Sequence, residues 1–143
     1  MKILIKNLQA KIPVSPTRIK KVILTTLSQE GVRPSGEISV LFVEDCQIRE
    51  LNAKFLHSRR ATDVIAFNLS DQKKSGVFVG DIAVSVDTAL RNARRFKTTP
   101  VYELCLYVAH GALHLLGYDD ASPAQQKKMH KKAEKILAAL KIK

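Results

Sequence analysis

The sequence predicts an α+β fold in which strands and helices are mixed within a single domain. Short segments rich in β-branched and apolar residues alternate with segments whose apolar residues recur at helical spacing. One helical segment, residues 100–116, is apolar on most sides, which is typical of a helix buried at the centre of a domain. The 143 residues are 45% hydrophobic and contain no repeat or linker, so they suffice for one domain with a real core.

The first half of the chain alternates between strand and helix. Residues 2–5, KILI, predict the first strand. Ser15 and Pro16 open a helix, because serine is a good N-cap and proline suits the first helical position. The apolar face of this helix consists of Ile19, Val22, Ile23 and Leu27. Residues 37–43, EISVLFV, predict a second strand, and residues 46–56, CQIRELNAKFL, predict a second helix.

The second half adds two strands and three helices. Residues 62–69, TDVIAFNL, and 80–86, GDIAVSV, predict the third and fourth strands, and residues 87–96 predict a helix with a basic outer face. Pro100 starts the long apolar helix. Residues 122–125, SPAQ, match a capping box and so predict a last helix. Its inner seam is Met129, Ala133, Ile136 and Leu140, and its lysines face away from that seam.

The chain is strongly basic. Its net charge is +11, from 24 Lys and Arg against 13 Asp and Glu. One basic run is typical of a solvated helix face, but several runs together favour a nucleic-acid partner, because each neutralised phosphate adds affinity. Aromatic residues are few, so no base-stacking platform is evident. The runs are Lys20 and Lys21; Arg59 and Arg60; Arg91, Arg94, Arg95 and Lys97; and Lys127, Lys128, Lys131, Lys132 and Lys135.

Nothing in the sequence predicts a membrane span or an export signal. No apolar run approaches the ~20 residues that a bilayer requires. The opening stretch, MKILIKNLQAKIPV, is too short and too interrupted by charge for a signal peptide. We therefore expect a cytoplasmic protein with no membrane partner, in which Cys46 and Cys105 are reduced thiols.

The stretch HGALHLLGYDD, residues 110–120, predicts a metal site. His110 and His114 lie four residues apart on the central helix and so project from one face. Gly117 stands where a helix often ends in a left-handed turn, which brings Asp120 back past the end of the helix. Two histidines and one carboxylate are a known ligand set for catalytic zinc. We expect one divalent ion, Zn²⁺ above others, bound by His110, His114 and Asp120.

The residues around this set bear on its chemistry. Gly111 occupies the place of the glutamate that serves as general base in the H-E-x-x-H proteases, so peptide hydrolysis is disfavoured. A hydrolase remains feasible, because a metal lowers the pKa of bound water to ~7. With the basic surface, a phosphodiester is the favoured substrate. Asp119 competes with Asp120 for the metal, and we favour an orienting role for Asp119.

The stretch resembles the signature of the YbeY family, H-G-x-L-H-L-x-G-Y-D-H. Residues 50–69, ELNAKFLHSRRATDVIAFNL, resemble the family segment L-N-x-x-Y/F-R followed by T-D-V-L-S-F, and residues 80–86 resemble its G-D-I-x-I-S strand. The resemblance implies one domain over residues 1–143, with a small, mostly four-stranded mixed sheet and a metal cleft beside the central helix. It also implies a metal-dependent endoribonuclease of single-stranded RNA, active in ribosomal RNA maturation and small-subunit quality control. Ribosomal proteins and assembly GTPases are further implied partners.

Three positions depart from the family pattern. His110 and His114 match two of the three metal-binding histidines, but Asp120 stands at the third. The family arginine thought to face the substrate phosphate falls on Leu56, and Ala66 replaces a frequent serine. Arg59 or Arg60 is a substitute substrate contact. The catalytic residue itself is left open, with a metal-bound water as the candidate. An alternative function is a non-catalytic RNA- or ribosome-binding assembly factor that keeps the fold.

Other polar residues have more than one interpretation. Thr62 and Asp63 fit either a turn cap before the third strand or a role in the cleft. Asp81 and Glu103 are expected to be structural, and His130 is expected to be an exposed residue among lysines. His57, near the two arginines, is a weaker candidate for RNA contact.

Overall fold

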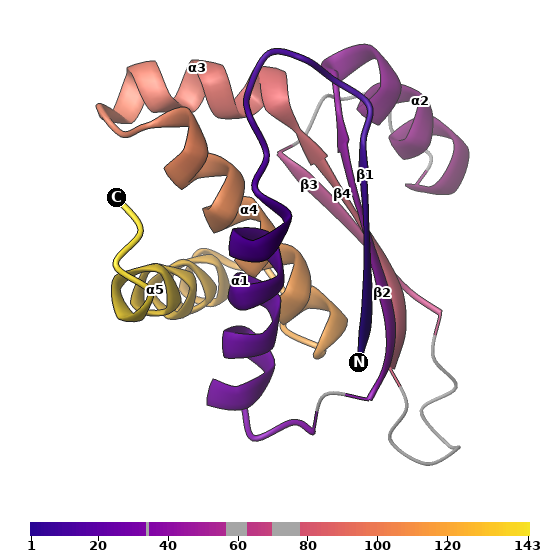
Figure 1. Cartoon of the computed structure of the whole chain (residues 1–143), viewed down its shortest axis with the longest axis vertical. Helices are drawn as coiled ribbons and strands as arrows, with labels where there is room; N and C mark the ends of the chain where they lie inside the picture. The colour runs from indigo at the N-terminus through magenta and orange to yellow at the C-terminus, as the bar shows by residue number, and fades with distance from the viewer. Residues whose placement is uncertain (34, 57–62, 70–77) are drawn as a thin grey trace.

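A four-stranded sheet runs through the middle of the molecule and has helices on both faces (Figure 1). The computed structural model describes residues 1–33, 35–56, 63–69 and 78–143. In chain order the elements are β1 (Lys2–Asn7), α1 (Pro16–Gln29), β2 (Gly36–Val43), α2 (Asp45–Leu56), β3 (Val64–Asn68), β4 (Phe78–Ser85), α3 (Val86–Phe96), α4 (Pro100–Leu115) and α5 (Pro123–Ala139).

The sheet is mixed, as the family resemblance implies. Its strand order is β1-β2-β4-β3. β1, β2 and β4 are parallel, and β3 pairs antiparallel with β4 along one edge. Ile82 of β4 stands between Val40 of β2 and Ala66 of β3. The predicted α+β class is therefore confirmed, with four strands and five helices in the part of the chain that the structure describes.

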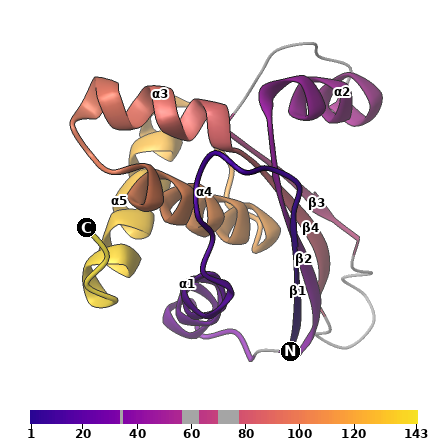
Figure 2. The ribbon, with the colours of Figure 1, turned by 45° about the horizontal axis from the view of Figure 1, so that its top comes forward.

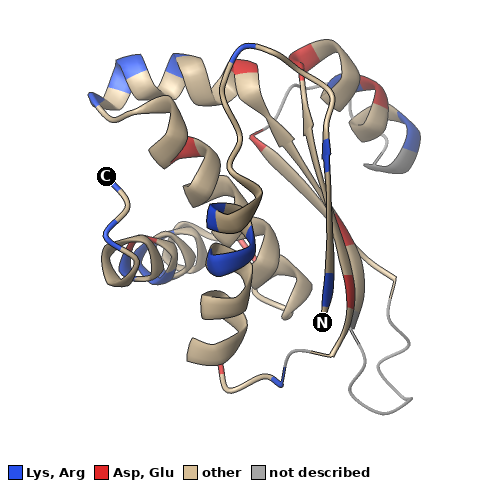
Figure 3. Ribbon diagram, viewed as in Figure 1, with Lys and Arg blue, Asp and Glu red and all other residues tan. Residues whose placement is uncertain are grey.

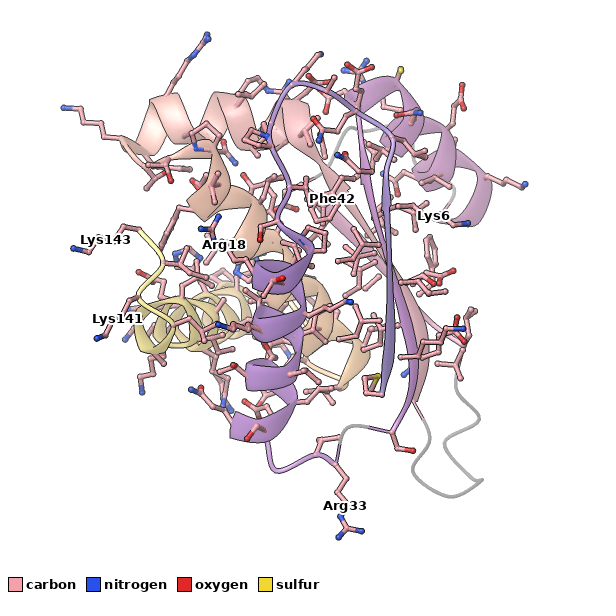
Figure 4. The ribbon with its side chains drawn as sticks, in the orientation of Figure 1. Lys6, Arg18, Arg33, Phe42, Lys141 and Lys143 are labelled. Atoms are coloured by element: carbon pink, nitrogen blue, oxygen red, sulfur yellow. The ribbon has the colours of Figure 1, made fainter. Side chains whose placement is uncertain are left out.

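The helices divide unequally between the two faces. Figure 2 shows α1, α4 and α5 on one side of the sheet, with α3 across one end, and α2 alone on the other side. The larger core lies between the sheet and the first group, and it includes the fully buried Phe42 of β2, labelled in Figure 4. A smaller cluster of Val43, Ile48, Ile65 and Ala83 joins α2 to the opposite face.

The helix boundaries follow the capping signals in the sequence. The Ser15 hydroxyl accepts a hydrogen bond from the Arg18 N–H, with Pro16 in the first turn. Ser122 and Gln125 form both hydrogen bonds of a capping box at the start of α5. The predicted inner seam of α5 is buried at Met129, Ala133 and Ile136, whereas Leu140 lies beyond the helix and is half-buried. Within the described part of the chain, the helices are too short or too polar to cross a membrane.

α4 is the central helix that the sequence predicts. Thr99 caps it, accepting a hydrogen bond from the Tyr102 N–H at 3.0 Å, and eleven of its sixteen residues are buried. It contacts α1, α3, α5, β3 and β4. Because it is packed on almost every side, its few polar side chains must either find partners or face a cavity.

A polar network joins α2 to α3 away from the core. The Asp45 carboxylate, 8% exposed as a residue, accepts hydrogen bonds from the Ser85 hydroxyl at 2.6 Å and the Arg91 guanidinium at 2.7 Å. The Asp87 carboxylate accepts from the Asp45 N–H at 2.8 Å and from Lys11 at 2.6 Å. Burial raises the pKa of Asp45, but these donors outweigh it and hold the pKa below its usual value.

Asp45→Ala is expected to lower the free energy of unfolding at neutral pH by about 1–3 kcal/mol, because the variant leaves its donors unpaired. The folded state binds the Asp45 proton less readily than the unfolded state does, so this stabilisation is present above the unfolded pKa of about 3.9. It is lost as pH falls through the lower, folded pKa. Urea titrations at neutral and acid pH measure the difference, which should shrink below about pH 4. Glu50→Ala, at an exposed position on the same helix, is the control; an equal effect there would contradict the assignment.

Candidate functional site

His110 and His114 lie on the same cavity wall, one helical turn apart on α4. The cavity has a volume of about 530 Å³. Asp63 and Val64 at the start of β3 form another part of its lining, and the loop after α4 contributes Asp120. α5 closes the remaining side with Pro123, Gln126, Lys127, Met129 and His130. Elements far apart in sequence therefore converge on the histidine pair.

The His110 side chain is partly buried, and its Nε2 atom is shielded from solvent. Its Nε2 atom has no hydrogen-bond partner within the described chain. Burial lowers the pKa of His110 to about 4, which outweighs the opposing effect of the Asp63 charge. A buried nitrogen without a partner costs free energy, so its retention points to a ligand that the lone pair would bind.

The His114 imidazole is held in one orientation by the loop that follows the helix. Its Nδ1 atom lies 3.1 Å from the Tyr118 carbonyl oxygen. A carbonyl oxygen only accepts hydrogen bonds, so this contact requires the proton on Nδ1 and leaves the Nε2 lone pair open. A backbone carbonyl that fixes the far nitrogen is the usual support of a metal-binding histidine.

The turn after α4 has the geometry that the glycine predicts. The Tyr118 N–H donates to the Leu113 carbonyl at 3.1 Å, and the Gly117 N–H donates to the His114 carbonyl at 3.0 Å. These two bonds are a Schellman motif. Gly117 has φ +99°, a left-handed conformation that favours glycine.

This turn returns Asp120 to the histidine pair. The Asp120 Oδ2 atom lies 3.6 Å from His114 Nε2. Two donors at 2.0–2.2 Å from one tetrahedral Zn²⁺ lie roughly 3.4 Å apart, so this spacing suits a shared ion. The Asp120 backbone is tied on both sides, since its N–H donates to Asp119 Oδ1 at 2.8 Å and its carbonyl accepts from Gln126 at 2.9 Å. Asp119 therefore supports its neighbour, in line with the orienting role expected for it.

The donors fit a metal in kind and orientation but do not form a finished set. Among the residues that the structure describes, no three His, Cys, Asp or Glu side chains are already gathered closely enough to hold an ion. His110 and His114 each present an open Nε2, and the Asp120 side chain is 57% exposed and so unconfined by packing. The metal set of His110, His114 and Asp120 remains a prediction.

Tyr118 fixes the position of this loop against two distant helices. Its hydroxyl donates to Glu30, at the end of α1, at 2.7 Å. Lys132 of α5 donates to the other oxygen of Glu30 at 2.9 Å. The ammonium groups of Lys128 and Lys132 lie 5.9 and 5.2 Å from the centre of the Tyr118 ring. Tyr118 therefore orients His114 through its backbone carbonyl while its own side chain is fixed by Glu30.

Gly111 is required by packing against the sheet. A Cβ atom at this position would lie 2.6 Å from Ile82 Cγ2 and 3.2 Å from Val64 Cγ2. Ile82 is fully buried and β-branched, so it has little room to move. The position therefore excludes the glutamate that a metalloprotease of the H-E-x-x-H type needs. This geometry supports the sequence-based argument against peptide hydrolysis.

A second cavity of about 440 Å³ adjoins the first and shares Asp63, His110 and His130 with it. Glu103 lines this cavity and is 3% exposed. Burial raises the pKa of Glu103, and the Thr98 hydroxyl, at 3.0 Å, opposes the rise. The hydrogen bond to Thr98 joins the α3–α4 connection to α4, which agrees with the structural role expected for Glu103.

The remaining predicted residues have mixed outcomes. Asp63 meets both interpretations, because its Oδ1 accepts from the Val64 N–H at 2.8 Å and the residue also lines both cavities. Asp81 lies within β4 opposite Phe67. Four positions lie outside the described residues: His57, Arg59, Arg60 and Thr62. The side chain of Leu56 lies outside them too.

The interpretation of His130 as merely exposed was incomplete. Its side chain is 50% exposed, but it lines both cavities and its ring centre lies 5.6 Å from that of His110. Sequence reasoning missed Tyr118 and Glu30 as well, although Tyr118 stands inside the histidine motif. No local pattern indicates these contacts, because the partners are 20 to 102 residues apart in sequence.

The chain has the features of an α+β protein with a histidine-lined cavity beside a buried central helix. Comparisons with known proteins identify the family. The family described as Endoribonuclease YbeY matches residues 4–141. A protein of Desulforamulus reducens named Endoribonuclease YbeY is 36% identical over 151 residues, which cover 99% of each chain. A protein of the same name from Clostridium botulinum is 35% identical over 163 residues, with 98% of each covered.

A solved structure agrees with these relatives. The solution structure of TM1509 from Thermotoga maritima superimposes with a TM-score of 0.59 at 27% identity, covering 97% of this chain and 91% of the other. The chain belongs to the YbeY endoribonuclease family. The resemblance inferred from three short motifs is thereby confirmed over nearly the whole length.

Proposed function

We propose that this protein is a metal-dependent endoribonuclease that cleaves single-stranded RNA during ribosomal RNA maturation and small-subunit quality control. Family membership supports an RNA endonuclease, which is a hydrolase. The observation that supports metal dependence is the buried Nε2 of His110, which has no hydrogen-bond partner among the described residues and lies near an oriented His114 and a carboxylate.

The side chains around the cavity have separate roles in this proposal. A bound Zn²⁺ supplies a Lewis acid and a source of hydroxide at neutral pH. His110 offers a lone pair that is not lost to protonation, because burial holds its pKa at about 4. Tyr118, through its carbonyl, holds the His114 ring with Nε2 open. Lys127 lines the same cavity and provides a cation for a backbone phosphate.

The charge distribution suits an RNA partner. Lys and Arg positions gather along α5 and at the far end of α3 (Figure 3). Arg33, Lys141 and Lys143 extend away from the body of the molecule in Figure 4. The candidate cavity lies beside the basic helix α5, so a strand bound by its charges would pass close to the histidines.

One assay tests the proposal. Purified protein is incubated with a single-stranded RNA and with the same sequence as a duplex, in the presence of zinc, of a chelator, and of zinc restored after chelation. We expect cleavage of the single strand alone, lost with the chelator and recovered with the metal. Binding of RNA without chelator-sensitive cleavage in any condition would favour the assembly-factor alternative instead.

RNA binding is expected to be strongly salt-dependent and to outlast removal of the metal. Each phosphate contact to a single strand contributes roughly −0.7 to the slope of log K against log salt. Lys127→Ala should reduce the magnitude of that slope by about 0.7, and neutralising Arg59 and Arg60 together should weaken binding further. Fluorescence anisotropy from low to moderate salt measures it, with Ser28→Ala, at an exposed and uncharged position, as the control. An affinity that does not change with salt would contradict a phosphate-directed surface.

A further inference from the structure

His130 of α5 lies beside His110 of α4, although the two are twenty positions apart in the chain. Their ring centres are 5.6 Å apart, with 50° between the ring planes. The chain has four histidines, and the three in the described residues, His110, His114 and His130, all line the first cavity. This gathering is notable because the chain has Asp120 where the family signature has its third histidine.

The separation of the two rings suits binding to one ion. Two imidazoles on a tetrahedral Zn²⁺ place their ring centres roughly 5 Å apart, because each nitrogen lies at about 2.0–2.1 Å from the metal. The observed 5.6 Å is close to that value. Side chains must still move to complete a set, since no three such donors in the described residues are already close enough to hold an ion, and the 50% exposure of the His130 side chain leaves it room to do so.

Glu134 lies beside one ring nitrogen of His130. Its Oε1 atom lies 3.2 Å from His130 Nε2, one helical turn along α5. A carboxylate at this nitrogen favours the proton on Nε2 and leaves the Nδ1 lone pair available. A carboxylate, an imidazole and a metal in sequence are a common arrangement in zinc proteins, in which the carboxylate sets the tautomer and raises ligand basicity.

We infer that His130 is a ligand of this metal centre, supplying from α5 the third imidazole that the family signature places at position 120, and that Glu134 orients it. The inference rests on the proposed metal centre and adds to it a residue outside the motif. With Asp120 the set then has three imidazoles and one carboxylate. Four protein donors would fill a tetrahedral ion, so the water that supplies hydroxide, or a substrate oxygen, would have to enter as a fifth ligand or displace one donor.

Zinc affinity is the first measurement, by competition with a chelating dye. His130→Ala is expected to weaken binding by more than 100-fold, beyond the 10–100-fold typical of orienting partners, and Glu134→Gln by roughly 10-fold. Lys135→Ala, at an exposed position on the same helix, should leave affinity unchanged. Circular dichroism of the metal-free variants should match the wild type, since His130 is half exposed and supports little packing.

Cobalt substitution distinguishes a metal ligand from a residue that only supports the fold, because the spectrum of bound Co²⁺ depends on its ligands. The visible spectrum of the Co²⁺ protein should change in His130→Ala, because the ligand set changes. If His130→Ala binds zinc as tightly as the wild type and gives the same cobalt spectrum, while His110→Ala loses both, then His130 is not a ligand and the proposed centre still stands. A wild type that binds no metal would overturn the centre and this inference together.

A further experiment tests whether His130 compensates for Asp120 at the position where the family signature has histidine. Asp120→His restores the third histidine of the signature. In that background, three histidines remain after loss of His130, so the loss should cost less than about 10-fold in zinc affinity. In the native chain only His110, His114 and Asp120 remain, and the loss should exceed about 100-fold. An equal loss in both backgrounds would show that His130 does not stand in for the missing histidine.

Discussion

Replacing His110 by leucine is expected to abolish zinc binding and chelator-sensitive RNA cleavage while leaving the metal-free protein at least as stable as the wild type. The ring nitrogen without a partner is unfavourable in a buried position, so an apolar side chain of similar size should raise the metal-free free energy of unfolding by about 1 kcal/mol. Elemental analysis and urea titration measure the two effects on the same samples.

With zinc bound, the wild type should become more stable than His110→Leu. Zinc at 1,000 times its dissociation constant adds about 4.1 kcal/mol to a protein that binds it only when folded. We therefore expect the wild type, but not His110→Leu, to gain thermal stability on zinc addition. Near-stoichiometric zinc in His110→Leu would contradict the assignment of this residue as a ligand.

Gly111→Glu, which recreates the protease-type H-E-x-x-H sequence, is expected to prevent stable folding. The first atom of the new side chain already collides with the fully buried Ile82, and a carboxylate would enter the core without a partner. A loss of more than about 4 kcal/mol is expected for such a change. Gly111→Ala should cost less, about 0–2 kcal/mol, because the overpacking of ~1–3 kcal/mol is offset by ~1 kcal/mol of helix propensity.

A double-mutant cycle identifies the cause of the Gly111 effect. Ile82→Ala removes the atoms that an alanine at position 111 would meet, so the two changes should be less damaging together than the sum of each alone. A coupling of about 0.5–3 kcal/mol is expected for side chains in contact. Strict additivity in thermal or urea unfolding would show that packing against Ile82 is not the reason for glycine here.

The parts of the site that depend on local sequence were predictable. The spacing of His110 and His114 requires only helical periodicity, and the Gly117 turn and the Ser122 capping box each depend on a few consecutive residues. The strands and helices follow from the same short-range patterns, which is why their boundaries shift by only a residue or two.

The parts that depend on tertiary packing were not predictable. The sequence around His130 shows a lysine-rich helix, and only the docking of α5 on α4 turns this residue to the cavity. The Tyr118–Glu30 hydrogen bond spans 88 residues, and no pattern in either segment indicates it. The sequence shows that Gly111 leaves no glutamate to act as a base. It does not show why glycine is needed there, because the side chain that excludes a larger residue, Ile82, lies on a different element, β4.

The place of α5 in the structure has a consequence for when the protein becomes active. Gln126 and Lys132 of this helix hold the Asp120 backbone and Glu30, and its apolar seam completes the core. α5 follows all the other elements in sequence, so during synthesis a ribosome makes it after the sheet and α4. The cavity cannot close until then. Until α5 is made and docked, the cavity lacks one wall and the Asp120 carbonyl lacks its hydrogen bond from Gln126, so we expect RNA cleavage to require the docked helix.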